Sequence, residues 1–180
     1  MHRLDRDTSG CLVVAKRRST LKRLHEALRR GEVGKRYQAL LAGAMARPTL
    51  AVEARLERQT GRGGESVMRV SAAGKAARSV FHRLAVVPDW TLAEVELHTG
   101  RMHQIRAHAA HLGLPVAGDR RYGDPEANQQ AGHAGLRRLF LHAAALDLPG
   151  EDGARLRIRA PLPADLRAVL ETMGMPIPHE

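Results

Sequence analysis

Two neighbouring runs of β-forming residues constrain the fold more than any other feature of the chain. They span residues 79–87 and 91–98 and flank Pro88-Asp89, a dipeptide typical of turns. In the second run, Leu92 and Val95 mix with glutamates, as expected for a strand with one buried face. The two runs predict an antiparallel hairpin, and therefore a fold built around an antiparallel sheet.

Further strands are predicted on both sides of this hairpin. Residues 35–41 resemble a strand, and residues 139–148 are an apolar run of strand length. Residues 155–159 alternate between apolar and basic side chains. Residues 1–9 are polar and lead into the apolar run 11–15, which we interpret as a loop that feeds a buried strand. Cys11, the single cysteine, lies in that run, so we expect a buried structural thiol and no internal disulfide.

Three helices are predicted, and two segments are predicted to be irregular. Leucines at 21, 24 and 28 recur at helical spacing, with Ser19 as the expected N-cap and Gly31 as the stop. Residues 102–111 and 164–173 are the other helices, whereas residues 47–74 and 118–130 are interpreted as mixed and loop-like segments. These elements predict one α+β domain over residues 1–180, with a mixed, mainly antiparallel sheet and short flanking helices.

Charge indicates the class of partner. The chain has 29 lysines and arginines against 19 acidic residues, a formal net charge of +10. Such an excess favours a polyanion, and above all a nucleic acid, although a basic proteome gives the same composition. No apolar run approaches membrane-spanning length and no secretory signal is visible, so we expect a cytoplasmic protein without a membrane partner.

Two polar segments carry the residues with chemical potential. Residues 2–10 place Asp5 and Asp7 beside two arginines, Arg3 and Arg6, in a loop before an apolar run. A carboxylate flanked by guanidinium groups stays ionised. Residues 99–108 carry Arg101, His103 and Arg106 on a predicted helix. The histidine spacing in that segment lacks the i, i+4 pair of a zinc-binding helix, so no metal site is predicted.

These segments resemble motifs of the RluA family of pseudouridine synthases, and most closely those of its C-type enzymes for 23S rRNA. His2-Arg3-Leu4-Asp5 with Thr8-Ser9-Gly10 resembles the family's active-site signature. Four further blocks follow in the family's order: Lys35-x-Tyr37-x-Ala39-Leu40, Gly100-Arg101-x-His103-Gln104-Ile105-Arg106-x-His108, Gly118-Asp119-x-x-Tyr122-Gly123 and Leu139-Phe140-Leu141-His142-Ala143. Because five motifs match in order, the resemblance is highly specific.

The resemblance implies a role for each matching residue. Asp5 falls on the family's essential aspartate, Arg106 on the basic residue that pairs with it, and Tyr37 on the tyrosine that packs against the target base. Arg101 is the second choice for the pairing role. We expect RNA contacts from the polar side chains of the two segments, namely Arg3, Arg6, Arg101, His103, Gln104 and His108.

The implied reaction is the isomerisation of specific uridines in RNA to pseudouridine. The N1–C1′ bond breaks, the base turns and C5 bonds to C1′, so neither a nucleotide cofactor nor any other cofactor is expected. Asp5 either attacks C1′ or assists departure of the base, and the target nucleotide must be flipped out of its helix or loop. Large-subunit 23S rRNA is the first expected substrate and tRNA the second, whereas the oligomeric state stays open.

Two other readings compete with this one. Family members carry a catalytic segment before the active-site motif, and many carry an S4 RNA-binding domain. Because the chain begins on the motif, we expect the first strands and the S4 domain to be missing, which would suit a catalytically impaired RNA-binding remnant. The second reading is a hydrolase or nuclease that holds a metal through Asp5 and Asp7, but Arg3 and Arg6 would repel the cation.

Overall fold

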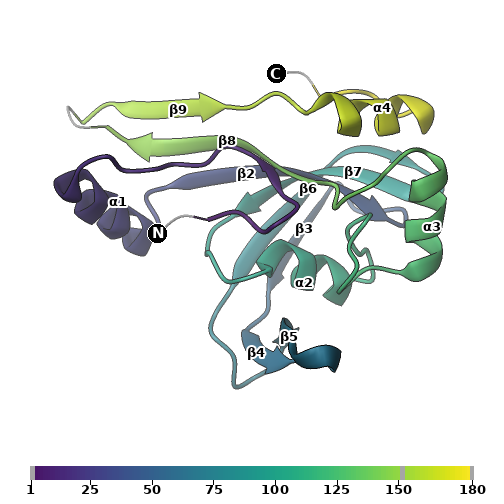
Figure 1. Ribbon diagram of the computed structural model, residues 1–180, viewed down its shortest axis with the longest axis horizontal. Helices are drawn as coiled ribbons and strands as arrows, with labels where there is room; N and C mark the ends of the chain where they lie inside the picture. Colours follow the sequence, from purple (N-terminus) through teal and green to yellow (C-terminus); the bar gives the residue numbers. More distant parts are fainter. Residues whose placement is uncertain (1–2, 151–152, 179–180) are drawn as a thin grey trace.

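The computed structural model describes residues 3–150 and 153–178 of the chain (Figure 1). Its strands are β1 (Ser9–Gly10), β2 (Gly34–Ala42), β3 (Thr49–Glu53), β4 (Leu56–Thr60), β5 (Ser66–Val70), β6 (Arg78–Val87), β7 (Trp90–Leu97), β8 (Leu141–Pro149) and β9 (Arg155–Arg159). Its helices are α1 (Arg18–Arg30), α2 (Gln104–His111), α3 (Pro125–His133) and α4 (Ala164–Thr172), with a 3₁₀ turn at Arg62–Gly64.

The predicted α+β class is confirmed. Within the described ranges, seven strands form one sheet in the order β1-β8-β2-β7-β6-β3, with β9 also paired to β8. The predicted hairpin is the β6–β7 pair, and its partners run from Ser79 and Leu97 at one end to Val87 and Trp90 at the other. All pairings in this sheet are antiparallel except that of β1 with β8. Strands β4 and β5 form a separate antiparallel hairpin, which extends below the sheet in Figure 1.

The central strand β2 separates two hydrophobic cores because its side chains alternate between the faces of the sheet. Tyr37, Ala39 and Leu41 belong to the core that also contains Ile105 of α2. Leu40 points to the opposite face, where it packs with residues of α3 and α4. Helix α2 therefore covers one face of the sheet, and the cleft described below lies on this face.

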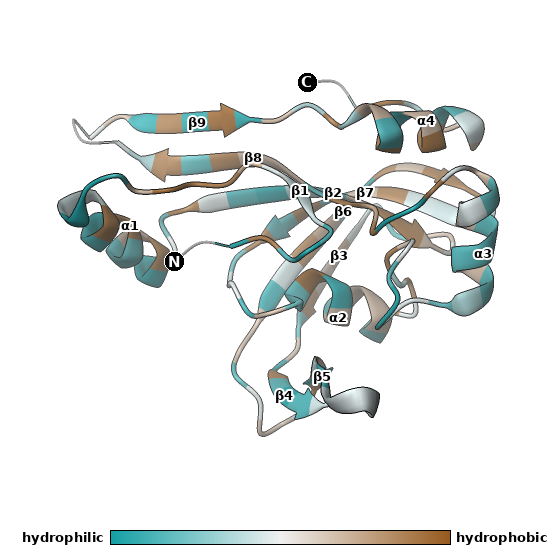
Figure 2. Cartoon of the chain, viewed as in Figure 1, coloured by the Kyte–Doolittle hydropathy of each residue, from teal (hydrophilic) through white to brown (hydrophobic). Residues whose placement is uncertain are grey.

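Helix α1 packs beside β8 and β9 through one apolar face. Ala27 and Leu24 of the helix share a cluster with Val33 and Leu148. Figure 2 shows teal and brown residues on different sides of this helix, as expected for an amphipathic segment. The predicted helix is confirmed, but it begins at Arg18 with Arg17 as the N-cap residue, so Ser19 is not the cap.

One predicted strand differs from the structure. The strand predicted over residues 11–15 is limited to the pairing of Ser9 and Gly10 with β8, and beyond it Leu12 and Val14 are exposed. Gly10 has a φ of 111° and lies so close to the backbone of Ala143 that a Cβ atom would collide with it. The prediction of a buried Cys11 is confirmed, and burial raises the pKa of its thiol.

The segments predicted to be irregular contain regular structure. Residues 118–130 include the start of α3, where the Asp124 side chain accepts a hydrogen bond from the Ala127 N–H and Pro125 occupies the first turn. Residues 47–74 form β3, β4 and β5. Among the described residues, no helix combines the length and the apolar character needed to cross a membrane.

Candidate active site

Asp5 lies in a short turn that leads into β1. The turn is closed by the Thr8 N–H, which donates to the Asp5 carbonyl over 3.0 Å. The Asp5 side chain accepts a hydrogen bond from Nη1 of Arg106 over 3.2 Å, and the carboxylate is only 18% exposed. The prediction that Arg106 pairs with Asp5 therefore holds in the structure, across 101 positions of sequence. His2 of the same motif lies outside the described residues.

Asp119 orients the Arg106 guanidinium. Its carboxylate accepts hydrogen bonds from Nε of Arg106 over 2.6 Å and from Nη2 over 2.8 Å, which is a bidentate pair. The Asp119 side chain is fully buried, and it also accepts the backbone N–H groups of Arg121 and Tyr122. Because the fork occupies Nε and Nη2, the Nη1 group is left to face Asp5.

The charges of this group reinforce one another. Burial acts to raise the pKa of Asp119, but the hydrogen bonds and charge of Arg106 outweigh it and lower the pKa. Burial also acts against the charged form of Arg106, yet Asp119 and Asp5 together raise its pKa above the ordinary value. Arg106 is therefore a permanent cation that lies beside Asp5.

Tyr37 projects from β2 into the same region, as predicted. It is 6% exposed, it contributes to the core beneath α2, and it lines the cleft that contains Asp5. Burial, followed by the negative charge of Asp5 and the proximity of Cys11, raises the pKa of its phenol to about 12. At neutral pH the ring is therefore uncharged, which suits a stacking surface for a base.

Asp5 opens onto a cleft of about 550 Å³ between the N-terminal turn, the end of α1 and the segment before α2. Among the described residues that line it, Asp5 is the one acidic side chain. The basic lining residues are Arg3, Arg29, Lys35, Arg101 and Arg106. A single carboxylate within a basic cleft is suited to act on a bound polyanion.

The six residues predicted to contact RNA fall into two groups. Arg3, Arg101 and His103 line the cleft, and Arg6 is exposed outside it. Gln104 also borders the cleft but is only 2% exposed, and His108 is 0% exposed and does not border it. Because these two side chains expose almost no surface, we infer a positioning role for them in place of an RNA contact.

The partners of the two buried side chains explain this positioning role. The Gln104 amide bridges β6 and the segment before α2, because it donates to the Arg78 carbonyl and accepts from the Arg101 N–H. The His108 ring lies between the Ser79 hydroxyl and the Ala54 carbonyl, at 3.1 and 3.0 Å. Both contacts fix α2 against the sheet and so hold Arg106 in place.

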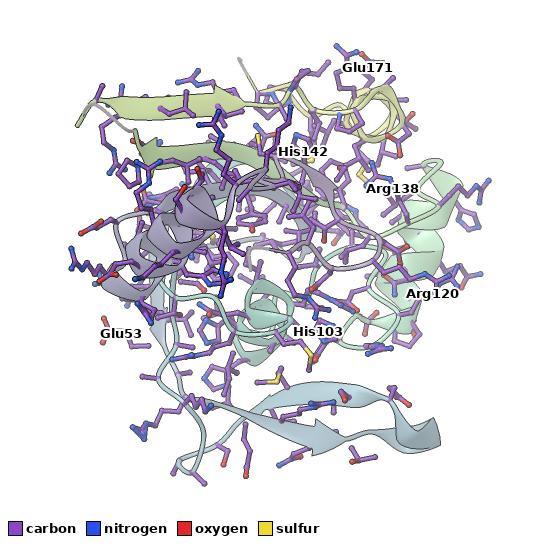
Figure 3. All side chains as sticks on the ribbon, turned by 60° about the vertical axis from the view of Figure 1, so that its left-hand side comes forward. Glu53, His103, Arg120, Arg138, His142 and Glu171 are labelled. Atoms are coloured by element: carbon purple, nitrogen blue, oxygen red, sulfur yellow. The ribbon has the colours of Figure 1, made fainter. Side chains whose placement is uncertain are left out.

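Tyr122 is a second residue, besides Asp119, whose role the sequence did not assign. Its ring lies 5.0 Å from the Arg106 guanidinium carbon, and its hydroxyl accepts the Met68 N–H over 2.7 Å. The same hydroxyl lies 2.9 Å from Nδ1 of His103, the residue labelled beside α2 in Figure 3. Both residues belong to the motif Gly118-Asp119-x-x-Tyr122-Gly123, so the resemblance marked their positions but not their partners.

His103 has an unusual backbone conformation at the start of α2. Its φ is +49°, in the left-handed region that few residues other than glycine adopt. Burial lowers the pKa of its imidazole, and the charges of Arg106 and Arg121 lower it further, against the opposing effect of Asp5. The ring is therefore mostly neutral at pH 7, and it is held by Tyr122 at the edge of the cleft.

The described residues contain no group of three or more histidine, cysteine, aspartate or glutamate side chains arranged to hold a metal ion. Asp7, the second carboxylate of the metal-dependent alternative, is exposed, and its carbonyl accepts a hydrogen bond from Arg138. Asp5 already faces the Arg106 guanidinium, which would repel a cation.

Comparisons with known proteins agree with the resemblance. The family model described as RNA pseudouridylate synthase matches residues 1–111. Ribosomal large subunit pseudouridine synthase C of Yersinia pestis is 46% identical over 171 residues, which cover 94% of this chain and 53% of the relative. The protein of the same name from Escherichia coli K12 is 44% identical over 177 residues, which cover 96% of this chain and 55% of that relative. The chain thus spans about half the length of the curated relatives it matches.

Two solved structures share the fold. Human RNA Pseudouridylate Synthase Domain Containing 4 matches with a TM-score of 0.81 and 24% identity, and the match covers 99% of this chain and 76% of the human chain. Human RNA Pseudouridylate Synthase Domain Containing 1 matches with a TM-score of 0.77 and 23% identity, and the match covers 99% of this chain and 81% of the human chain. At these identities the likeness concerns the fold alone. The family match over residues 1–111, more than half of the sequence, shows that this chain belongs to the RNA pseudouridylate synthase family.

Proposed function

We propose that this protein converts specific uridines of RNA into pseudouridine, with Asp5 as the catalytic carboxylate. The observation that carries the proposal is the pairing of Asp5 with Arg106 in a basic cleft that Tyr37 also lines. In this arrangement the carboxylate faces a guanidinium group, is partly shielded from water and is open to a flipped nucleotide. Family membership agrees with this chemistry.

Each residue of the cleft has a place in the reaction. The Asp5 carboxylate attacks C1′ or assists departure of the base, so that the N1–C1′ bond breaks. The detached uracil turns against the neutral ring of Tyr37, and C5 then bonds to C1′. In the direct-attack route this step breaks the bond between Asp5 and C1′ and releases the carboxylate. The C5 proton is released to solvent and N1 takes up a proton, so the product is an isomer and no redox partner is needed. Arg106, held by Asp119, orients the Asp5 carboxylate through its hydrogen bond.

We propose large-subunit rRNA as the substrate, in the cytoplasm. The support is the similarity to proteins named ribosomal large subunit pseudouridine synthase C, which extends over more than nine-tenths of this chain. The basic lining of the cleft suits phosphate groups of either rRNA or tRNA. We further propose that residues 1–180 act as one catalytic domain.

Tritium release from RNA tests the proposal directly. A 23S rRNA transcript labelled with tritium at C5 of uridine releases tritium to water only when C5 bonds to C1′. We expect release by the wild-type chain, and a loss on the order of 10³-fold or more in Asp5→Asn, because the essential carboxylate is removed. Asp7→Asn, a change of the neighbouring exposed carboxylate, is the matched control and should keep nearly wild-type activity.

The outcomes separate the competing readings. RNA binding without tritium release by the wild-type chain would support the catalytically impaired remnant. Equal activity of Asp5→Asn and wild type would overturn the role of Asp5. Release from a labelled tRNA pool but not from the 23S transcript would reassign the substrate, and activity that EDTA abolishes would favour the metal-dependent alternative.

A further inference from the structure

One face of α1 carries a row of basic side chains outside the catalytic group. Arg18, Lys22, His25 and Arg29 are spaced by four, three and four residues, which places them on a single stripe of the helix. We call this row the α1 stripe. The 13 residues of α1 extend over about 20 Å, so the stripe is long compared with one nucleotide.

The stripe begins at the catalytic cleft and leads away from it. Arg29, near the end of α1, lines the cleft of Asp5 together with Leu28 and Gly31. Arg18, Lys22 and His25 line a shallow, open hollow of about 510 Å³ near the other end of the helix. The positive lining of the cleft therefore continues along α1 toward the left-hand end of the molecule in Figure 1.

The region of α1 has a large excess of basic residues. Residues 16–30 contain seven lysines and arginines but a single acid, Glu26. Glu26 pairs with Arg29 at 3.6 Å and with Arg30 at 2.9 Å. Within the part of the chain that the structure describes, Arg18 and Lys22 are exposed and form no ion pair with an acidic side chain. The outer part of the α1 stripe therefore presents positive charge to solvent.

Helix stability does not account for these residues. The first turn of α1 contains no acidic residue, and Arg17 at the N-cap makes no side-chain capping bond. Positive charges at a helix N-terminus oppose the helix dipole, so Arg17 and Arg18 are locally unfavourable choices. Such a conflict between local preference and sequence is typical of residues selected for binding.

His25 lies in the α1 stripe but is not one of the proposed contacts. Its Nε2 atom is buried and has no hydrogen-bond partner among the described residues. The ring also borders an apolar hollow that Leu21, Leu24 and Leu28 line. Because a buried nitrogen is out of reach of a phosphate, the inference rests on Arg18, Lys22 and Arg29.

We propose that α1 binds the RNA backbone that flanks the target uridine, with Arg18, Lys22 and Arg29 as phosphate contacts. The inference rests on the proposed function, because it assigns the α1 stripe to the same RNA that enters the cleft. The contacts are to phosphates, so they position the RNA and add affinity without reading its sequence. A substrate cut close to the target uridine would reach Arg29 but not Arg18 or Lys22.

The test compares two double variants of equal charge change. Arg18→Gln with Lys22→Gln removes the outer part of the α1 stripe. Arg137→Gln with Arg167→Gln removes two exposed charges, one in the segment before β8 and one on α4. Helix α4 lies at the opposite end of the molecule from α1 (Figure 1). The probes are a 23S rRNA fragment that contains a pseudouridine site mapped for the wild type, and a short oligonucleotide cut around that site. Affinity is measured from 50 to 300 mM KCl.

We expect the α1 variant to bind the long fragment roughly 20- to 50-fold more weakly at 0.1 M salt. Its plot of log K against log salt should be shallower by about 1.4–1.8, which is about 0.7–0.9 for each lost phosphate contact. Its affinity for the short oligonucleotide and its turnover on saturating RNA should match the wild type. The control variant should keep the wild-type slope, and the melting temperature of the α1 variant should not fall, since the helix dipole no longer opposes these charges.

Failure of this inference differs from failure of the proposed function. An α1 variant with wild-type slope and affinity on the long fragment overturns the role of α1, whether or not the chain is active. Equal weakening on the long and short RNAs also overturns it, because the effect then lies inside the cleft. A wild-type chain that binds RNA but releases no tritium refutes the proposed function and leaves the α1 comparison intact.

Discussion

Two arginine–aspartate pairs hold the N-terminal turn from opposite sides, and they differ mainly in burial. Arg106 binds Asp119 through two hydrogen bonds, and Arg138 binds Asp165 through two, at 2.7 and 3.1 Å. In each pair the remaining Nη1 group donates to the turn. Nη1 of Arg106 reaches the Asp5 carboxylate, and Nη1 of Arg138 reaches the Asp7 carbonyl over 3.3 Å.

The environments of the two pairs are very different. The side chains of Arg106 and Asp119 are 10% and 0% exposed, whereas those of Arg138 and Asp165 are 25% and 55% exposed. Water can replace the partners of the exposed pair but not those of the buried pair. We infer that the same bidentate geometry supports the proposed catalytic group in one place and acts as a surface brace in the other, and that burial distinguishes the two.

Breaking the buried pair should have the larger effect. Asp119→Asn keeps the shape of the side chain but leaves the Arg106 cation with Asp5 as its remaining acidic partner in a nearly dry site. We expect a loss of about 3–5 kcal/mol in the free energy of unfolding, the usual cost of an uncompensated buried charge. Urea unfolding followed by circular dichroism measures it.

Activity separates positioning from stability in this variant. At a temperature where Asp119→Asn is still folded, tritium release should fall because Arg106 no longer has a fixed orientation toward Asp5. Turnover should be affected more than the KM for RNA, since Asp119 is buried and does not contact the substrate. A folded Asp119→Asn protein with wild-type turnover would show that the fork is structural only.

Lowering the pH should also distinguish the buried Arg106–Asp119 pair from the exposed Arg138–Asp165 pair, through the stability that each pair loses. Arg106 lowers the pKa of the buried Asp119 against the effect of burial, and the Arg138 hydrogen bond lowers the pKa of the exposed Asp165. The unfolded carboxyl groups therefore take up protons at a higher pH than the folded ones. The stability that each pair provides is present above about pH 4 and is lost as the pH falls through the folded pKa, at no more than about 1.4 kcal/mol per pH unit for one group.

Unfolding curves between pH 6 and pH 2.5 check this prediction. The slope of stability against pH should flatten more in Asp119→Asn than in Asp165→Asn, because solvent screens the exposed pair. Equal flattening in both variants would mean that burial does not distinguish the pairs. A wild-type slope in Asp119→Asn would mean that its carboxylate is not stabilised in the folded state.

The sequence predicted the proposed catalytic residues better than the residue that orients them. Asp5, Tyr37 and Arg106 could be identified because short motifs surround them, and the structure brings all three to one cleft. The role of Asp119 could not be predicted, because it follows a left-handed Gly118 in a segment that resembled a polar loop. Nothing in a local pattern shows that such an aspartate is fully buried or that it binds Arg106 from 13 residues away.

The same limit explains the reassignment of His108 and Gln104. A polar residue in a basic motif suggests a surface contact, yet both side chains point into the protein and satisfy backbone groups of β6 and its neighbours. The hairpin of β6 and β7 was predictable because its strands are adjacent in sequence. Contacts between α2 and the sheet could not be predicted in this way, since they depend on how segments that are distant in sequence pack.

The smallest effect should come from the exposed pair. Asp165→Asn removes the charge that faces Arg138, but water can solvate the guanidinium, and its contacts with the Asp7 carbonyl and the Ser9 hydroxyl remain. We expect a loss of about 0.2–1 kcal/mol in the free energy of unfolding, and tritium release close to the wild type. The same unfolding and release measurements apply. A loss of activity without a loss of stability would instead give Arg138 a role in positioning the turn that carries Asp5, and burial would then no longer separate the functional pair from the brace.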